Sequence, residues 1–303
     1  MTDAREGPAS LLSSHRHDID QHRETYAMSD AGFSWPGGAS VAVSVTFDVD
    51  AESGWIGDDE GYRRRLTTMS EGRYGVVRGT PRILSLLNRF EIPGTFFVPG
   101  LTSDWYPHLI PGLLDAGHEV AHHGYLHLRT DKSTHSQQRD EIERGLAALN
   151  KAGAPKPRGY RSPAWEMTPE TFDLLKEFDF TYDSSCMGDD RPYVETWERG
   201  SILELPVHWS LDDWPRFGWS IDGGGNVADP AEMFASWSEE YRNARDEGRH
   251  LVLTMHPEVI GRAYRLAHLE RLLEAIACEG VAWFATMDQV AVHVQPQFSG
   301  VLA

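Results

Sequence analysis

The sequence predicts an α/β protein, a single (β/α) barrel that is distorted or incomplete and has seven or eight strands. Two observations predict this fold class. From residue 41 onward, short β-branched and aromatic runs alternate with segments whose apolar residues recur at helical spacing. In addition, no break in composition divides the 303 residues into two domains. Apolar residues make up 40% and charged residues 24%, as is typical of a globular protein.

The predicted strands are short, and bounded by glycine, proline or charged residues. They are expected at residues 41–49, 94–98, 118–122, 158–161, 180–184, 202–207, 250–255 and 281–286. Helices are expected between them, at residues 80–90, 106–116, 136–151, 168–178, 230–247 and 262–279. Pro81 in a first helical turn and Gly117 just past a helix end support two of these boundaries.

Two connections, residues 51–79 and 185–201, are too long to be simple turns. In a barrel, the loops that follow the strands build the active site. Residues 51–79 follow the first strand, so we expect them to form a lid-like loop over the site. The barrel domain is expected at residues 39–295, between a flexible N-terminal arm at residues 1–38 and a C-terminal tail at residues 296–303.

Composition excludes several classes of protein. No stretch approaches eighteen uninterrupted apolar residues, which excludes a membrane-spanning helix. The 28 Lys and Arg against 46 Asp and Glu give a net charge of −18, which disfavours nucleic acid as a partner. Residues 1–30 lack the apolar run of a secretory signal, and the histidines of this arm are expected to be solvated (His15, His17 and His22). With Cys186 and Cys278 as its only cysteines, the chain is expected to be cytoplasmic and free of disulfides.

Two acids close the first predicted strand. Asp48 and Asp50 are two residues apart, so their carboxylates lie on one face of the strand. Two carboxylates so close repel each other unless a cation or an arginine lies between them. The alternative is a pair of strand-end acids that point into water.

Four histidines lie within residues 118–127. His118 and His122 match the zincin pattern H-E-x-x-H, which requires a helix, but the glycines at 117 and 124 leave only six residues between them. The other interpretation takes His123 and His127 together with a carboxylate from elsewhere, a ligand set of catalytic metal sites. We then expect His118 and His122 to be ordinary turn residues.

Three further residue groups are candidates for the site. Arg161 follows a predicted strand and can hold a carboxylate, although a surface arginine is the alternative. His256 ends the apolar strand at residues 250–255, where packing alone is the alternative role. Asp212 or Asp213 can partner that histidine. The sequence contains no G-x-S-x-G elbow and no P-loop.

In this order, the motifs resemble those of the polysaccharide deacetylase family, the NodB-homology domain of carbohydrate esterase family 4. The matching segments are T-F-D-V-D at residues 46–50, H-G-Y-L-H at 123–127, R-S-P-A-W at 161–165 and L-T-M-H at 253–256. The spread F-D-V-D form and Gly124 look like a cytosolic branch that includes peptidoglycan-deacetylase-like proteins and relatives that hydrolyse cyclic amides. The resemblance covers roughly residues 40–290.

The resemblance implies a metal centre. Asp50, His123 and His127 would bind a divalent metal ion, with zinc expected first. Such an ion lowers the pKa of a bound water from 15.7 toward about 7 and polarises a carbonyl group. Both effects suit the hydrolysis of an amide.

The resemblance also implies an acid and a base. Asp48 would be the general base, held by Arg161. His256 would be the general acid that protonates the leaving amine, tuned by Asp213 or Asp212. Proton transfers of this kind need groups whose pKa is matched to the working pH.

The expected function is therefore metal-dependent hydrolysis of a non-peptide C–N bond, first of all in an N-acetylated amino sugar. A cyclic amide or imide hydrolase is the alternative, and Trp55, Tyr125 and Trp165 are the expected substrate-binding residues. A metal-holding protein without turnover is a third hypothesis, but it would not require both Asp48 and His256. The expected partner is a small-molecule or carbohydrate substrate, with neither nucleic acid nor membrane, and a homo-oligomer is left open.

Overall fold

The computed structural model describes residues 32–302 of the chain. Its strands are β1 (Val41–Asp48), β2 (Gly94–Val98), β3 (Glu119–His122), β4 (Gly159–Tyr160), β5 (Tyr182–Asp183), β6 (Tyr193–Trp197), β7 (Gly200–Glu204), β8 (Trp219–Ser220), β9 (Gly224–Gly225), β10 (His250–Met255) and β11 (Ala282–Phe284).

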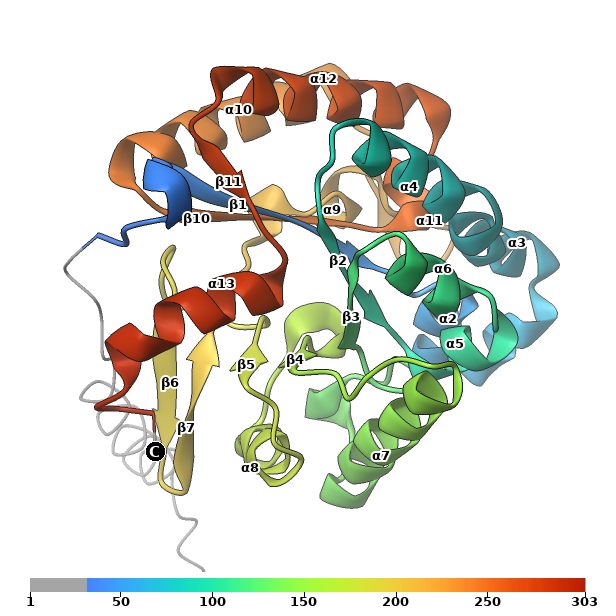
Figure 1. Ribbon diagram of the computed structural model, residues 1–303. Helices are drawn as coiled ribbons and strands as arrows, with labels where there is room; N and C mark the ends of the chain where they lie inside the picture. The colour runs from blue at the N-terminus through green and yellow to red at the C-terminus, as the bar shows by residue number, and fades with distance from the viewer. Residues whose placement is uncertain (1–31, 303) are drawn as a thin grey trace, which may run out of the picture.

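The α-helices of the described residues surround these strands (Figure 1). They are α2 (Glu52–Asp58), α3 (Leu66–Tyr74), α4 (Thr80–Arg89), α5 (Gly100–Trp105), α6 (Leu109–Asp115), α7 (His135–Lys151), α8 (Pro169–Glu177), α9 (Trp214–Phe217), α10 (Pro230–Glu247), α11 (Pro257–Ile260), α12 (Ala263–Glu279) and α13 (Met287–Val294). None of the helices in the described part of the chain is long and apolar enough to cross a membrane.

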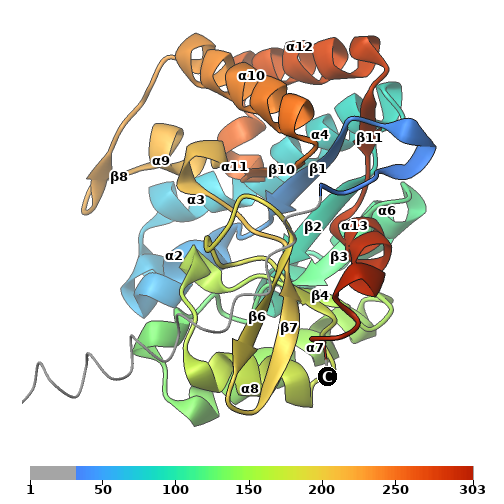
Figure 2. The same cartoon turned by 90° about the vertical axis from the view of Figure 1, so that its left-hand side faces the viewer.

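The sheet is a curled, open barrel, as predicted. Its order is β10-β1-β2-β3-β4-β5-β7-β6, and β11 pairs with the beginning of β1. Within the described residues, eight strands pair in parallel, while β6 joins the β7 edge as an antiparallel strand. The separate hairpin β8–β9 projects from the side of the barrel, beyond α9 (Figure 2). This arrangement brings the carboxyl ends of the parallel strands to one end of the barrel.

Strand β1 lies between β10 and β2, pairs with β11 as well, and is completely buried. Val43, Val45 and Phe47 face the outer core, in a cluster that also contains apolar residues of α4, α10 and α12. Side chains alternate along a strand, so Thr46 and Asp48 face the other side, into the barrel. A buried strand that ends in acids on its inner face therefore places carboxyl groups inside the barrel.

Part of the expected N-terminal arm belongs to the barrel. Trp35 is only 3% exposed, its indole N–H donates to the Gly248 carbonyl at 3.0 Å, and its ring contacts Trp283 and His293. Phe298, expected in the C-terminal tail, is buried as well. Phe33 and Trp35 therefore pack with the barrel. The expected solvated arm, with His15, His17 and His22, lies outside the described residues.

Removal of the Trp35 side chain tests this anchoring. Trp35→Ala should lower the free energy of unfolding by about 3–5 kcal/mol, because it removes a large buried ring and leaves a cavity. Trp219→Ala is the matched control, since Trp219 is 52% exposed. Urea denaturation of the two variants makes the comparison, and equal stabilities would show that Trp35 does not anchor the fold.

Residues 51–79 are not the irregular loop that the sequence led us to expect. They form α2, a 3-10 turn at Glu60–Arg64, α3 and a π-helical turn at Gly75–Gly79 that runs directly into α4. Close backbone contacts hold this segment: a Cβ on Gly72 would lie 2.5 Å from the Ala51 carbonyl oxygen. Helix α3 buries only Gly72, so it lacks the apolar stripe by which a helix is predicted.

Two other predicted regions also differ from the structure. The helix expected at residues 106–116 is shorter in the structure, where α6 spans Leu109–Asp115, and a separate helix, α5, ends before Pro107. The second long connection, at residues 185–201, contains the edge strand β6, whose partly exposed end weakens its apolar pattern. Neither difference moves the carboxyl ends of the parallel strands.

Candidate metal and catalytic site

The side chains singled out in the sequence meet at the carboxyl end of the barrel. Each follows or ends a parallel strand: Asp48 and Asp50 at β1, His123 and His127 after β3, Arg161 after β4 and His256 after β10. Asp212 reaches the same end by pairing with Thr254 of β10. The parallel topology therefore gathers residues that lie more than two hundred positions apart in the sequence.

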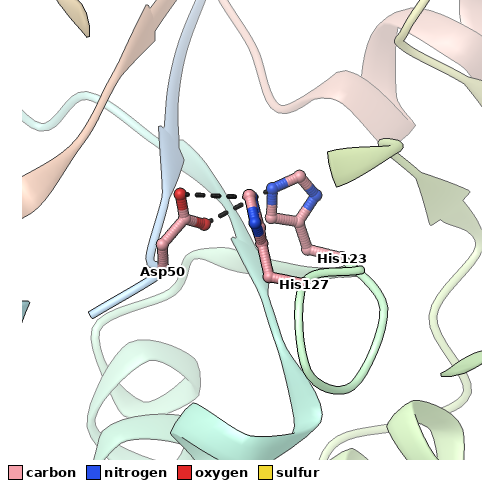
Figure 3. A group of neighbouring side chains, drawn as sticks. All are labelled: Asp50, His123 and His127. Atoms are coloured by element: carbon pink, nitrogen blue, oxygen red, sulfur yellow. Dashed lines mark ion pairs between the residues drawn. The ribbon is translucent and has the colours of Figure 1, made fainter. Parts of the chain in front are cut away.

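Asp50, His123 and His127 form a compact donor cluster (Figure 3). Asp50 Oδ1 lies 3.4 Å from His123 Nε2, and Asp50 Oδ2 lies 3.3 Å from His127 Nε2. Asp50 Oδ1 is buried and has no hydrogen-bond partner among the described residues. One carboxylate and two imidazoles that converge in this way are the donor set of a divalent metal site with open positions. The residues present fit such an ion.

The electrostatics of Asp50 and His127 agree with this fit, whereas Asp48 and Asp50 outweigh burial and raise the pKa of His123. Burial acts to raise the pKa of Asp50, but the neighbouring His127 and His123 outweigh it and leave the pKa well below its usual value. Burial lowers the pKa of His127. An ionised carboxylate beside a neutral imidazole is the form in which these groups bind a metal.

A second layer of contacts orients the two histidines. His123 Nδ1 donates to the Arg161 carbonyl at 2.7 Å, which leaves Nε2 free to face Asp50. The loop that carries His127 turns through two left-handed residues, Gly124 at φ 73° and His127 at φ 63°. Its backbone is fixed by Glu141.

Glu141 lies on the buried side of α7 and accepts backbone N–H groups of this loop. The donors are Tyr125 at 2.9 Å, Leu126 at 2.9 Å and Leu128 at 3.3 Å. Glu141 was not among the residues predicted for the site. A signal was available, since this acid directly precedes Ile142 on the apolar face of the predicted helix.

Glu141→Gln should weaken zinc binding about 10–100-fold, because the loop that positions His127 loses an acceptor for its N–H groups. Competition with a chromogenic chelator measures the affinity. Glu143→Gln is the matched control, because Glu143 lies on the same helix, is exposed, and pairs only with Arg139 among the described residues. Equal zinc affinities in the two variants would contradict a positioning role for Glu141.

Asp48 is paired with Arg161 inside the barrel. The guanidinium Nη1 lies 2.7 Å from Asp48 Oδ1, and Arg161 is completely buried. Its remaining N–H groups donate to Thr46 Oγ1 and to the carbonyl and hydroxyl of Ser184, each at 3.0 Å. The ring of Phe97 lies 4.0 Å from the guanidinium carbon. Arg161 is thus held on every side, and Asp48 Oδ2 is left 4.0 Å from His123 Nε2, next to the metal ligands.

His256, at the end of β10, is hydrogen-bonded to Asp213. Its Nδ1 lies 2.8 Å from Asp213 Oδ1 and 3.6 Å from Asp212 Oδ1, and the Asp212 carboxylate caps the Trp214 N–H instead. Burial opposes the imidazolium, but Asp212 and Asp213 raise the pKa of His256 well above its usual value. Its Nε2 lies 3.9 Å from Asp50 Oδ2, so the free end of the ring faces the metal ligands.

His118 and His122 make structural contacts. His118 directly precedes β3 and His122 ends it, and a strand spaces residues four apart by roughly 13 Å, too far to share one metal ion. His118 Nδ1 accepts the Gly94 N–H, and His122 bridges the Gly124 N–H and the Ile142 carbonyl. Burial lowers the pKa of His122 to about 3. The zincin arrangement is therefore absent from residues 118–122.

A cavity of about 160 Å³ opens onto the cluster. Trp55 of α2 and Trp165 line it, and so does Trp209, which stacks on Trp165 with a ring separation of 4.1 Å. Trp209 and two further lining acids, Asp58 and Glu258, were missed by the sequence analysis.

Tyr125, by contrast, does not line this cavity, and its expected substrate contact is not supported. Its hydroxyl donates to Asp104 at 3.2 Å, and Arg144 covers its ring. The left-handed turn at Gly124 explains why a neighbour of the metal ligands points elsewhere. Helix α2, on the other hand, does form one wall of the cavity, so the segment after β1 narrows the site as a helix.

Known proteins are similar to this chain in both sequence and fold. A family model described as "Polysaccharide deacetylase" matches residues 58–182. The chain is 29% identical to the peptidoglycan deacetylase of Helicobacter pylori, over 83% of this chain and 95% of that protein. It is 42% identical to the crystal structure of a "putative polysaccharide deacetylase" from Mycobacterium smegmatis, with a TM-score of 0.85 over 89% of this chain and 95% of the other. PuuE allantoinase is similar in fold, with a TM-score of 0.78 and 24% identity over 90% of this chain and 96% of the other.

Proposed function

This chain belongs to the polysaccharide deacetylase family, and from that premise we propose that it hydrolyses a non-peptide C–N bond, first of all in N-acetylated amino sugars. One observation carries the proposal. Two separately supported groups suited to proton transfer adjoin the metal-type cluster, Asp48 held by Arg161 and His256 held by Asp213. A protein that only holds a metal would need neither of them.

The position of each residue in the site indicates its role in the reaction. A divalent ion held by Asp50, His123 and His127 would polarise the carbonyl and acidify a water molecule. Asp48 accepts the proton of the attacking water, while Arg161 holds one of its oxygens and fixes its direction. His256 gives a proton to the leaving nitrogen from Nε2, because Nδ1 is engaged by Asp213.

We also propose zinc as the ion, since two imidazoles and one carboxylate are typical of catalytic zinc sites. A cytoplasmic location is also proposed, and two free cysteines, Cys186 and Cys278, are compatible with it. The substrate is proposed to be a carbohydrate or another small molecule, with no role for nucleic acid or membrane. Light scattering of the purified protein would give its molar mass and show whether it forms a homo-oligomer.

A second candidate function is the hydrolysis of a cyclic amide or imide. The size of the cavity favours it, because about 160 Å³ accommodates one small ring and lies below the about 300–1,000 Å³ of typical ligand pockets. The aromatic walls formed by Trp55 and Trp165 are suited to a flat ring as well as to a sugar.

One assay compares the two functions. Zinc-loaded protein is offered chitin oligomers of one to five units and, in parallel, hydantoin and succinimide, and acetate release and ring opening are recorded. We expect turnover that a chelator abolishes and zinc restores, and short substrates should be used better than long ones. Absence of zinc-dependent hydrolysis of both classes would contradict the proposal, and equal use of long oligomers would contradict the small-substrate preference.

A further inference from the structure

Asp58 is an acid at the open side of the catalytic cavity that none of the roles above uses. It is the last residue of α2, it is exposed, and it lines the cavity together with Trp55 of the same helix. The end of α2 packs directly on the loop of the metal ligands: a Cβ on Gly57 would lie 2.5 Å from the His127 carbonyl oxygen. Glycine at this position allows the close contact that places Asp58 next to this loop.

The charge of Asp58 is not paired within the described part of the chain. Asp48, which lines the same cavity, is bound to Arg161, whereas Asp58 makes no hydrogen bond or ion pair with any described residue. Asp131 raises the pKa of Arg129 and Asp58 adds to this effect, but the guanidinium is bonded to Asp131 at 2.7 Å and does not line the cavity. A cation from outside the chain can therefore pair with the Asp58 carboxylate.

The other walls of the cavity also suit a cation. Trp55 and Trp209 line it, and Trp209 is 41% exposed, so a ligand that enters the cavity can reach its ring. The faces of indole rings attract ammonium groups. Among the described residues no lysine or arginine lines the cavity, and the His256 imidazole is held by Asp213 at 2.8 Å. A positively charged group near Asp58 therefore meets a carboxylate and aromatic rings.

We propose that Asp58 selects substrates that carry a protonated amine in addition to the amide that is cleaved. The amide would lie at the metal ligands, and the ammonium group would point outward, toward Asp58 and the indole rings at the open side of the cavity. This inference rests on the proposed hydrolase and narrows its substrates to small cationic amides. An anionic amide of the same length would bring a second negative charge close to Asp58 and bind less tightly.

Binding of three matched probes tests the inference without turnover. They are alkyl hydroxamic acids that chelate zinc at one end and carry an ammonium, a methyl or a carboxylate group at the other, in a series of increasing chain length. Calorimetry on zinc-loaded wild type should give about 5-fold tighter binding of the ammonium probe than of the methyl probe at the best length, and the weakest binding of the carboxylate probe. In Asp58→Asn the ratio of ammonium to methyl probe should fall below about 2-fold.

Asp59→Asn is the matched control. It removes one negative charge from the next residue, whose carboxylate accepts the Gly61 N–H at 2.7 Å and does not line the cavity. The ratio of ammonium to methyl probe should stay at its wild-type value in this variant. The comparison separates a charge at the cavity from the overall negative charge of the chain.

Several results would overturn the role of Asp58. They are equal binding of the ammonium and methyl probes by the wild type at every length, the wild-type ratio in Asp58→Asn, an equal fall of the ratio in Asp59→Asn, or loss of zinc from Asp58→Asn. Absence of zinc-dependent amide hydrolysis by the wild type would refute the proposed function instead, since the ratio is measured by binding alone.

Discussion

Asp48→Asn protein is expected to bind zinc like the wild type and to hydrolyse its amide substrate about 10²–10⁴-fold more slowly. Asparagine keeps the shape of aspartate but cannot accept the proton of the attacking water. The two acids at the end of β1 should therefore differ in role, with Asp50 facing both histidines and Asp48 bound to Arg161. Turnover and zinc content of the same preparation make the measurement.

Stability has to be measured along with activity. Arg161 is completely buried, so neutralising its partner leaves a charge without compensation, which destabilises a protein by roughly 3–5 kcal/mol in buried pairs. Circular dichroism shows whether the variant is folded at the assay temperature. Loss of zinc from folded Asp48→Asn would make Asp48 a metal ligand, and unchanged turnover would end its assignment as the base.

The second large effect is expected at His256. His256→Ala should reduce turnover about 10²–10⁴-fold without emptying the metal site, because the leaving amine loses its proton donor. The protonated imidazole is the active form, so kcat/KM of the wild type should decline as the pH rises through the pKa of His256.

The Asp213→Asn variant tests whether His256 is the acid, because it should shift the pH profile of kcat/KM in a known direction. Asp213 is one of the two carboxylates that raise the pKa of His256, so its neutralisation should lower that pKa. The alkaline decline of kcat/KM should then begin at a lower pH than in the wild type. A decline at unchanged pH would mean that another group titrates there, and full activity of His256→Ala would exclude it as the acid.

Much of the site follows from the sequence, because its residues end or follow strands. The period of two placed Asp48 and Asp50 on one face, and the parallel topology brings them to His123 and His127. The choice between Asp212 and Asp213 could not be made from the sequence, since the two are adjacent. It depends on a distance of 2.8 Å against 3.6 Å to His256 Nδ1.

The parts that could not be predicted depend on contacts between distant segments. Glu258, in the cavity wall, packs against Gly75 of a segment far away in the sequence. Trp35 precedes the first strand by a few residues, yet its burial depends on Trp283 near the other end of the chain. No local pattern carries such information. Tyr125 illustrates the converse, since closeness in sequence to His123 and His127 did not bring it into the cavity.

The metal content of His127→Ala tests the central claim most directly. After dialysis against zinc and then against buffer, the wild type should retain one zinc ion per chain by mass spectrometry, and His127→Ala should retain none. His118→Ala, measured alongside, should keep its zinc, because that histidine accepts the Gly94 N–H outside the cluster. Zinc retained by His127→Ala, or lost only from His118→Ala, would contradict a metal centre formed by Asp50, His123 and His127.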